Sequence, residues 1–203
     1  MSPPAGILSG MVITWATALA AMLVGALLPS LHPIFAAMPS AGLADLLLFS
    51  IGLMAVHKVE SYVTGEFDHC PVYLGLADKP WVRSLRQAAF ITFCTTFLAL
   101  AVLLALAMRG PPWPLLVMAV WCAQGLHEVH HLAKSLARRR YYPGTASGAL
   151  FVAFIDLVFF PAYLGELSLA AREPVRLAYY AAQPLLLCAF FVEDRAWLAR
   201  RAG

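Results

Sequence analysis

Residues 115–131 read "LLVMAVWCAQGLHEVHH", an apolar run that ends in three histidines and a glutamate. An apolar run of about 20 residues is typical of a helix that crosses a bilayer. Ionisable groups are costly at membrane depth, so each one found there is a candidate functional residue. This stretch therefore predicts a membrane helix with a functional site near one end.

The rest of the chain has the same character. Of its 203 residues, 62% are hydrophobic and 12% are charged, and the mean hydropathy is +0.77. This composition excludes a water-soluble globule. Apolar runs of spanning length occur at 6–30, 42–63, 86–108, 114–136, 147–169 and 175–195. We therefore predict an all-α, polytopic membrane helical bundle of about six transmembrane helices, forming a single integral membrane domain over residues 1–203.

The basic residues predict the orientation of this bundle. They gather in two loops and the C-terminal tail, all on one side: Lys79, Arg83, Arg86, Lys134, Arg138, Arg139, Arg140, Arg195, Arg200 and Arg201. The opposite loops hold only Arg109, Arg172 and Arg176. By the positive-inside rule both termini of this multi-pass protein should be cytoplasmic. The first run lacks a basic leader and a small-residue cleavage site, so we expect it to be a retained helix. The net charge of +3 then reflects topology, and no nucleic-acid partner is expected.

Imidazoles and carboxylates from several helices should meet at one depth. His127, His130 and His131 follow helical spacing and share a side of their helix. In "HKVES", His57 and Glu60 are three residues apart and share one side of a different predicted helix. At about 1.5 Å per residue, His57 and His131 both lie roughly 10 Å, and Asp156 roughly 13 Å, from the predicted cytoplasmic ends of their helices.

Such a group of side chains is typical of a metal site in a helix bundle. The predicted ligands are His57, Glu60, His127, His130, His131 and Asp156. Imidazole suits zinc, copper and iron, and neighbouring carboxylates favour iron or manganese. We expect one or two ions, iron first, with zinc or manganese as the alternatives. "HEVHH" also fits H-x-x-H-H, the form of one histidine box in membrane-bound desaturases and hydroxylases, although six histidines in all do not make their full ligand set.

The turn after the histidines has its own interpretation. Pro143 and Gly144 make a tight turn, from which Tyr141 can reach the headgroup layer or the bundle. The arginines beside it could bind anionic lipid or a phosphate-bearing substrate, or they could simply follow the positive-inside rule.

Three motifs together are similar to the HxxEE domain family, small bacterial membrane proteins of uncharacterised function. They are "HKVESYVTG" with His57 and Glu60, a distal histidine at His131, and "YYPG" with Tyr141, Pro143 and Gly144. The resemblance covers roughly residues 45–165. Ser61 stands where the family has its second glutamate, so a ligand at that position would have to come from Glu128, Asp156 or His127. The resemblance implies a multi-pass protein of a bacterial cell (inner) membrane, and it implies no activity.

We therefore expect a membrane metalloenzyme, most naturally an iron-dependent oxidoreductase that hydroxylates or desaturates a lipid-like or small hydrophobic substrate from the bilayer, with a possible redox partner. With zinc, a hydrolytic or isomerising reaction becomes the expectation. Glu60 and Glu128 are the candidate general bases, and Tyr141 is a third candidate catalytic residue.

Two other functions stay open. A haem-binding electron carrier would use His57 and His131 as axial ligands. A transporter or lipid-binding module would use the same residues as a proton or ion path. The sequence leaves the oligomeric state open.

Overall fold

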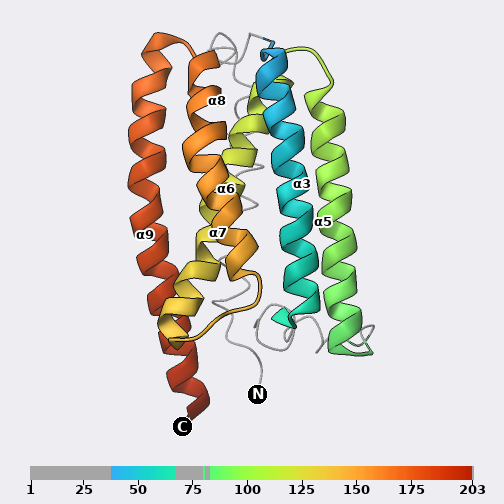
Figure 1. Cartoon of the computed structure of the whole chain (residues 1–203), viewed down its shortest axis with the longest axis vertical. Coiled ribbons are helices and arrows are strands. Elements are labelled where there is room, and N and C mark those ends of the chain that lie inside the picture. The colour runs from blue at the N-terminus through green and yellow to red at the C-terminus, as the bar shows by residue number, and fades with distance from the viewer. Residues whose placement is uncertain (1–37, 67–79, 81–82, 203) are drawn as a thin grey trace.

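The computed structural model describes residues 38–66, 80 and 83–202 of the chain. Within these ranges the regular elements are all helical, as predicted (Figure 1). They are α3 (Ala41–Val63), α5 (Leu85–Ala107), α6 (Trp113–Arg138), α7 (Thr145–Phe154), the π-helical turn η3 (Ile155–Phe159), α8 (Phe160–Glu166) and α9 (Leu169–Ala202). The predicted run at 6–30 lies outside the described residues.

Local sequence explains where the helices begin and end. Ser40 and Ser84 cap α3 and α5 by accepting from the backbone N–H groups of Leu43 and Gln87, at 3.3 and 3.1 Å. The α6 helix has a proline in its first turn and ends at Arg139, which adopts a left-handed conformation with φ of 51°. Gly144, with φ of 81°, starts α7. The "YYPG" segment is thus a tight connection between α6 and α7.

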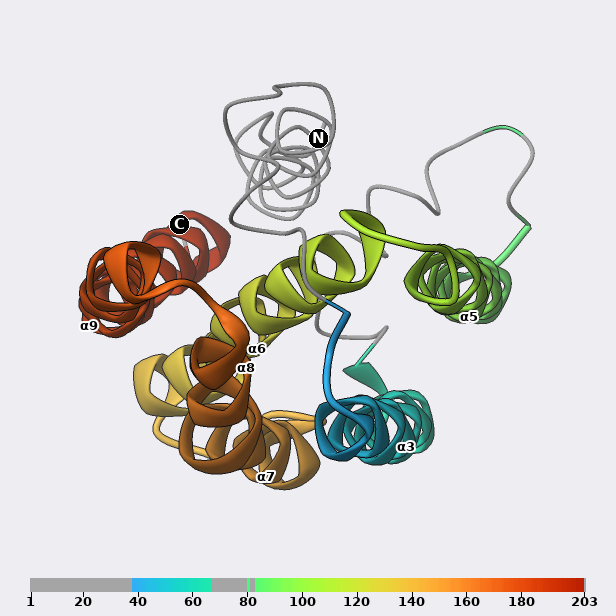
Figure 2. The same cartoon turned by 90° about the horizontal axis from the view of Figure 1, so that it is seen from above.

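The α6 helix lies at the centre of the bundle. It packs against α9, α7 and α5, while α3 packs against α7 and η3. Seen along the bundle in Figure 2, α6 runs between α9 on one side and α3 and α5 on the other. Residues on different faces of α6 therefore meet different neighbours, which decides which of its polar side chains converge.

Trp121 fixes the contact between α3, α6 and α7. Its ring meets that of Phe151 edge to face at 5.7 Å between centroids, and its indole N–H donates to the hydroxyl of Ser50 at 2.6 Å. All three side chains are buried. An interhelical hydrogen bond in a membrane protein contributes about 0.6–1.7 kcal/mol, so this one helps to align the three helices that carry the site described below.

A buried ion pair fixes α9 to the end of α6. Arg138 donates from Nε and Nη2 to the two carboxylate oxygens of Asp194, at 2.9 and 2.7 Å. The Arg138 guanidinium also lies over the rings of Tyr142 and Trp197, at 4.8 and 5.1 Å from their centroids. Because both charges are almost fully covered, the pair specifies how these helix ends meet.

Three of the described helical segments are long and apolar enough to cross a membrane. They are Ala41–Val63, Thr145–Glu166 and Leu169–Ala199; in α5 the apolar segment is the shorter Leu98–Ala107. These helices identify a membrane protein by length and composition. The α6 helix contains the histidines, Glu128 and Lys134, and its central place in the bundle covers those polar groups. The number of crossings and the cytoplasmic placement of the termini stay predictions.

Candidate metal centre

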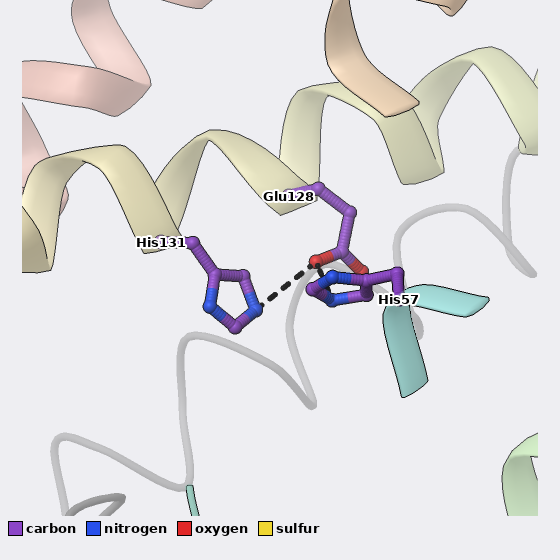
Figure 3. Close-up of side chains that lie close together, drawn as sticks. All are labelled: His57, Glu128 and His131. Carbon is purple, nitrogen blue, oxygen red and sulfur yellow. Dashed lines mark ion pairs between the residues drawn. The ribbon is translucent and has the colours of Figure 1, made fainter. Parts of the chain in front are cut away.

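His57 from α3 and Glu128 and His131 from α6 form the centre of the site (Figure 3). Each of the three side chains has an exposed fraction of 0%. Glu128 and His131 are three residues apart, so α6 presents both on the face toward α3. One oxygen of the carboxylate, Oε2, lies 3.0 Å from His57 Nε2 and 3.3 Å from His131 Nε2.

The contacts of Glu128 Oε2 with the two imidazoles have ion-pair distances (dashed lines in Figure 3) but do not have hydrogen-bond geometry. Within the part of the chain that the structure describes, His57 Nε2, His131 Nε2 and Glu128 Oε2 have no hydrogen-bond partner. Buried polar atoms without partners are costly and rare in folded proteins. The three atoms lie close enough together to bind one metal ion.

The other nitrogen of each imidazole is held from behind. His131 Nδ1 donates to the backbone carbonyl of Pro143 at 2.8 Å, and His57 Nδ1 is 3.1 Å from the hydroxyl of Ser147. A carbonyl only accepts, so the proton of a neutral His131 is on Nδ1 and the lone pair of Nε2 faces Glu128. Two lone pairs that face each other repel unless a proton or a metal ion lies between them. Metal-ligating histidines are commonly oriented in this way by a second shell.

The second oxygen of Glu128, Oε1, orients the carboxylate. It accepts from Gln124 Nε2 at 2.5 Å and from Lys58 Nζ at 3.3 Å. These donors fix Oε1 and direct Oε2 toward the two histidines. Gln124 lies one turn from Glu128 on α6, and Lys58 follows His57 on α3.

Glu60, a predicted ligand and general base, connects α3 to the turn after α6. Its Oε2 accepts from the backbone N–H of Ser147 at 2.9 Å, and its Oε1 accepts from the hydroxyl of Tyr141. Burial and this hydrogen bond to the Glu60 carboxylate raise the pKa of Tyr141, so its hydroxyl stays protonated and donates. The structure therefore gives Glu60 and Tyr141 a supporting position, one bond away from the residue that orients His57.

Gly144 allows the turn to pass directly behind both histidines. A Cβ at this position would lie 2.8 Å from Cε1 of His131 and 2.9 Å from Cε1 of His57, and would also meet the hydroxyl of Ser61. Its positive φ disfavours other residues independently of this crowding. The turn, His57 and His131 thus form one unit, which gives the spacing of the three sequence motifs a structural reason.

A second group of possible ligands adjoins the first. Glu66, His130 and His131 are all buried, and their ligand atoms also lie close enough together to bind an ion. His130 Nδ1 donates to the carbonyl of His127 at 2.8 Å, which leaves Nε2 as its ligand atom. Glu66 is not among the ligands predicted from the sequence, because its position just after the end of α3 has no helical spacing to the histidines.

Like Glu60, the predicted ligands His127 and Asp156 lie outside both groups. His127 is buried, and neither of its nitrogens has a hydrogen-bond partner among the described residues; its ring lies 6.2 Å from that of Phe190 on α9. Asp156 accepts hydrogen bonds from Tyr179 and Gln183 on α9. Of the three replacements considered for the family's second glutamate, it is Glu128 that joins His57 and His131, while Ser61 is buried beside Gly144.

Comparison with known proteins agrees with these motifs. The family described as "Protein of unknown function with HXXEE motif" matches residues 47–159. No curated protein and no solved structure matches the chain. The matched region includes His57, Glu128, His131 and the turn that orients them. The resemblance predicted from the motifs is confirmed, and the chain belongs to the HXXEE family.

Proposed function

We propose that this protein is a membrane-embedded, metal-dependent enzyme whose ion is bound by His57, Glu128 and His131. One observation supports the proposal above all. Two imidazole Nε2 atoms and a carboxylate oxygen converge, fully buried and without hydrogen-bond partners among the described residues. A structural hydrogen-bond network would be expected to satisfy those atoms. The Nδ1 contacts prepare both histidines to bind a cation through Nε2.

Iron is the ion that we propose first. Two histidines and one carboxylate, with further positions left open, are typical of non-haem Fe(II) oxygenases. When bound, the iron would supply oxygen-dependent oxidation, here hydroxylation or desaturation of a lipid-like or small hydrophobic substrate, with electrons from a redox partner. The protein's own residues fix the ligands: Gln124 and Lys58 direct Glu128, while Ser147 and Pro143 direct the histidines. The long apolar helices favour a substrate that arrives from the bilayer.

The same three ligands also suit catalytic zinc, which is bound by two histidines and a glutamate in several hydrolases. A hydrolytic or isomerising reaction is therefore the second candidate. Manganese would fit the same donors, and the adjoining Glu66 and His130 would allow a second ion.

The geometry favours an ion over haem. The rings of His57 and His131 meet edge to face with 4.6 Å between their centroids, which leaves no room for a porphyrin plane between two axial ligands. A proton or ion path through the same residues is the remaining alternative.

Elemental mass spectrometry of the protein purified in mild detergent tests the proposal. We expect a bound transition metal near one equivalent or, with the adjoining group, two. His131→Ala and Glu128→Gln should lose it. His127→Ala is the matched control, because it removes a buried histidine of the same helix that lies outside both groups.

The identity of the metal separates iron-dependent oxidation from zinc chemistry, and an absorption spectrum reports haem. A folded protein that binds no transition metal after incubation with iron, zinc or manganese would refute the enzyme proposal, and the residues would then form an ion-pair network or proton path.

A further inference from the structure

A groove on another face of α6 lies between that helix, α7 with η3, and α9. Its volume is about 550 Å³, within the range of small-molecule sites, about 300–1,000 Å³. Val129, Leu157, Pro184 and Leu187 contribute to its apolar wall. It shares no residue with either group of possible metal ligands.

Asp156 places a carboxylate in this apolar wall. The hydroxyl of Tyr179 and the amide of Gln183 donate to it at 2.8 and 2.7 Å, and both bonds end on the same oxygen, Oδ1. The second oxygen, Oδ2, is therefore the acceptor that Asp156 offers to a molecule in the groove. Asp156 and Gln183 both line the groove, so the residue that carries this acceptor lies at its surface.

The backbone around Asp156 is also unusual. Residues Ile155–Phe159 form a π-helical turn within the Thr145–Glu166 span, and such turns occur frequently at functional sites. The hydroxyl of Tyr180 donates to the carbonyl of Asp156 at 3.0 Å, which satisfies a backbone group at the distorted turn. Two neighbouring tyrosines of α9 thus fix both the side chain and the backbone of this residue.

The depth of the Asp156 carboxylate in the membrane limits which polar group a molecule in the groove can carry. At about 1.5 Å per residue, Asp156 lies roughly 16 Å from the start of its span, near the middle of a hydrocarbon core of about 30 Å. An ammonium head group would have to lose its hydration to reach this depth, and pairing with the carboxylate recovers that cost only where the geometry is excellent. A hydroxyl group offers a hydrogen-bond donor without a charge.

We propose that the groove binds a membrane-soluble molecule with a long apolar chain and a hydroxyl group, which donates to Oδ2 of Asp156. The chain lies along the apolar wall and the hydroxyl meets the carboxylate. This site is independent of the proposed enzymatic function, because it uses other residues on another face of α6.

Photolabelling in phosphatidylcholine nanodiscs tests this site. The probe is hexadecanol with a diazirine in its chain, and its attachment is mapped by peptide mass spectrometry. We expect label on peptides that contain Leu157 or Leu187. Unlabelled hexadecanol should compete better than hexadecyl methyl ether, which has no donor, by roughly three- to tenfold, the ratio that one hydrogen bond supplies.

Three variants separate the groove from its carboxylate. Ala153→Phe fills the groove from its wall and should abolish the label, whereas Leu150→Phe, exposed on the same helix and outside the groove, should not. Asp156→Ala should remove the preference for alcohol over ether, and Ala153→Phe keeps the proposal testable if Asp156→Ala does not fold. Equal competition by the ether, or label spread evenly over all exposed helices, would overturn the proposal.

Discussion

Replacing Gly144 by alanine should displace both histidines of the proposed metal site at once. The new Cβ would lie 2.8 and 2.9 Å from the Cε1 atoms of His131 and His57, roughly 0.6–0.7 Å short of an ordinary carbon contact of about 3.5 Å. Metal–ligand distances tolerate only about 0.2 Å of error. The left-handed conformation adds about 1–2 kcal/mol of strain for an alanine. We therefore expect metal affinity to fall by at least about tenfold, the lower end of the loss found for altered second shells.

A graded set of glycine variants makes this expectation specific. At Gly148, a Cβ would lie 3.3 Å from Cε1 of His57, a tight but smaller conflict; at Gly52, in the same helix as His57, it would meet nothing within 4 Å. Competition with a chelator of known affinity, alongside thermal unfolding, gives the assay. Affinity should decrease from Gly52→Ala through Gly148→Ala to Gly144→Ala. If a folded Gly144→Ala variant binds metal as tightly as Gly52→Ala, the reasoning about the turn is wrong.

Three further contacts can be tested by substitution. Ser147→Ala removes the contact with His57 Nδ1 and should weaken metal binding by about 10–100-fold, whereas Ser147→Thr should retain it; equal affinities in a chelator titration would show that the hydroxyl has no such role. Arg138→Ala leaves Asp194 buried and unpaired and should cost about 3–5 kcal/mol in detergent unfolding; a loss no larger than that of the exposed Arg140→Ala would contradict this. Trp121→Phe and Ser50→Ala break the same bond, so each should cost about 0.6–1.7 kcal/mol and the double variant less than their sum; full additivity would argue against the bond.

Most helix positions could be predicted because apolar runs of bilayer length leave few alternatives. The predicted runs 42–63 and 86–108 differ by one residue at their ends from Ala41–Val63 and Leu85–Ala107. The predicted run 175–195 is shorter than Leu169–Ala202, because the polar ends of α9 continue the helix without an apolar pattern. The π turn at Ile155–Phe159 cannot be predicted from hydropathy, because its residues are as apolar as those of an α-helix and the contacts of Asp156 with tyrosines on α9 are tertiary.

The candidate site could be predicted in kind but not in detail. His57 and His131 have equal predicted depths in the membrane, which indicated that they could meet. In the structure their ring centroids are 4.6 Å apart. Helical spacing alone does not show whether Glu60 or Glu128 is the ligand, because each of them shares a helical face with a histidine. Only the packing of α3 on α7 shows that Glu60 accepts from Ser147. Asp156 has a similar predicted depth, but its side chain faces α9. The π turn that contains Asp156 changes the direction in which side chains leave the helix, and the sequence does not reveal that turn.

The two imidazoles of the site are oriented by partners of different chemical origin, and this affects how the protein tolerates mutation. His131 is held by the main-chain carbonyl of Pro143, a group that every amino acid possesses. His57 is held by a side-chain hydroxyl, that of Ser147. A saturation library should therefore be restricted at position 147 to serine and threonine, while position 143 should accept any residue that preserves the turn. Alanine scanning would detect the contact of Ser147 and miss that of the Pro143 carbonyl, although both orient a ligand equally directly.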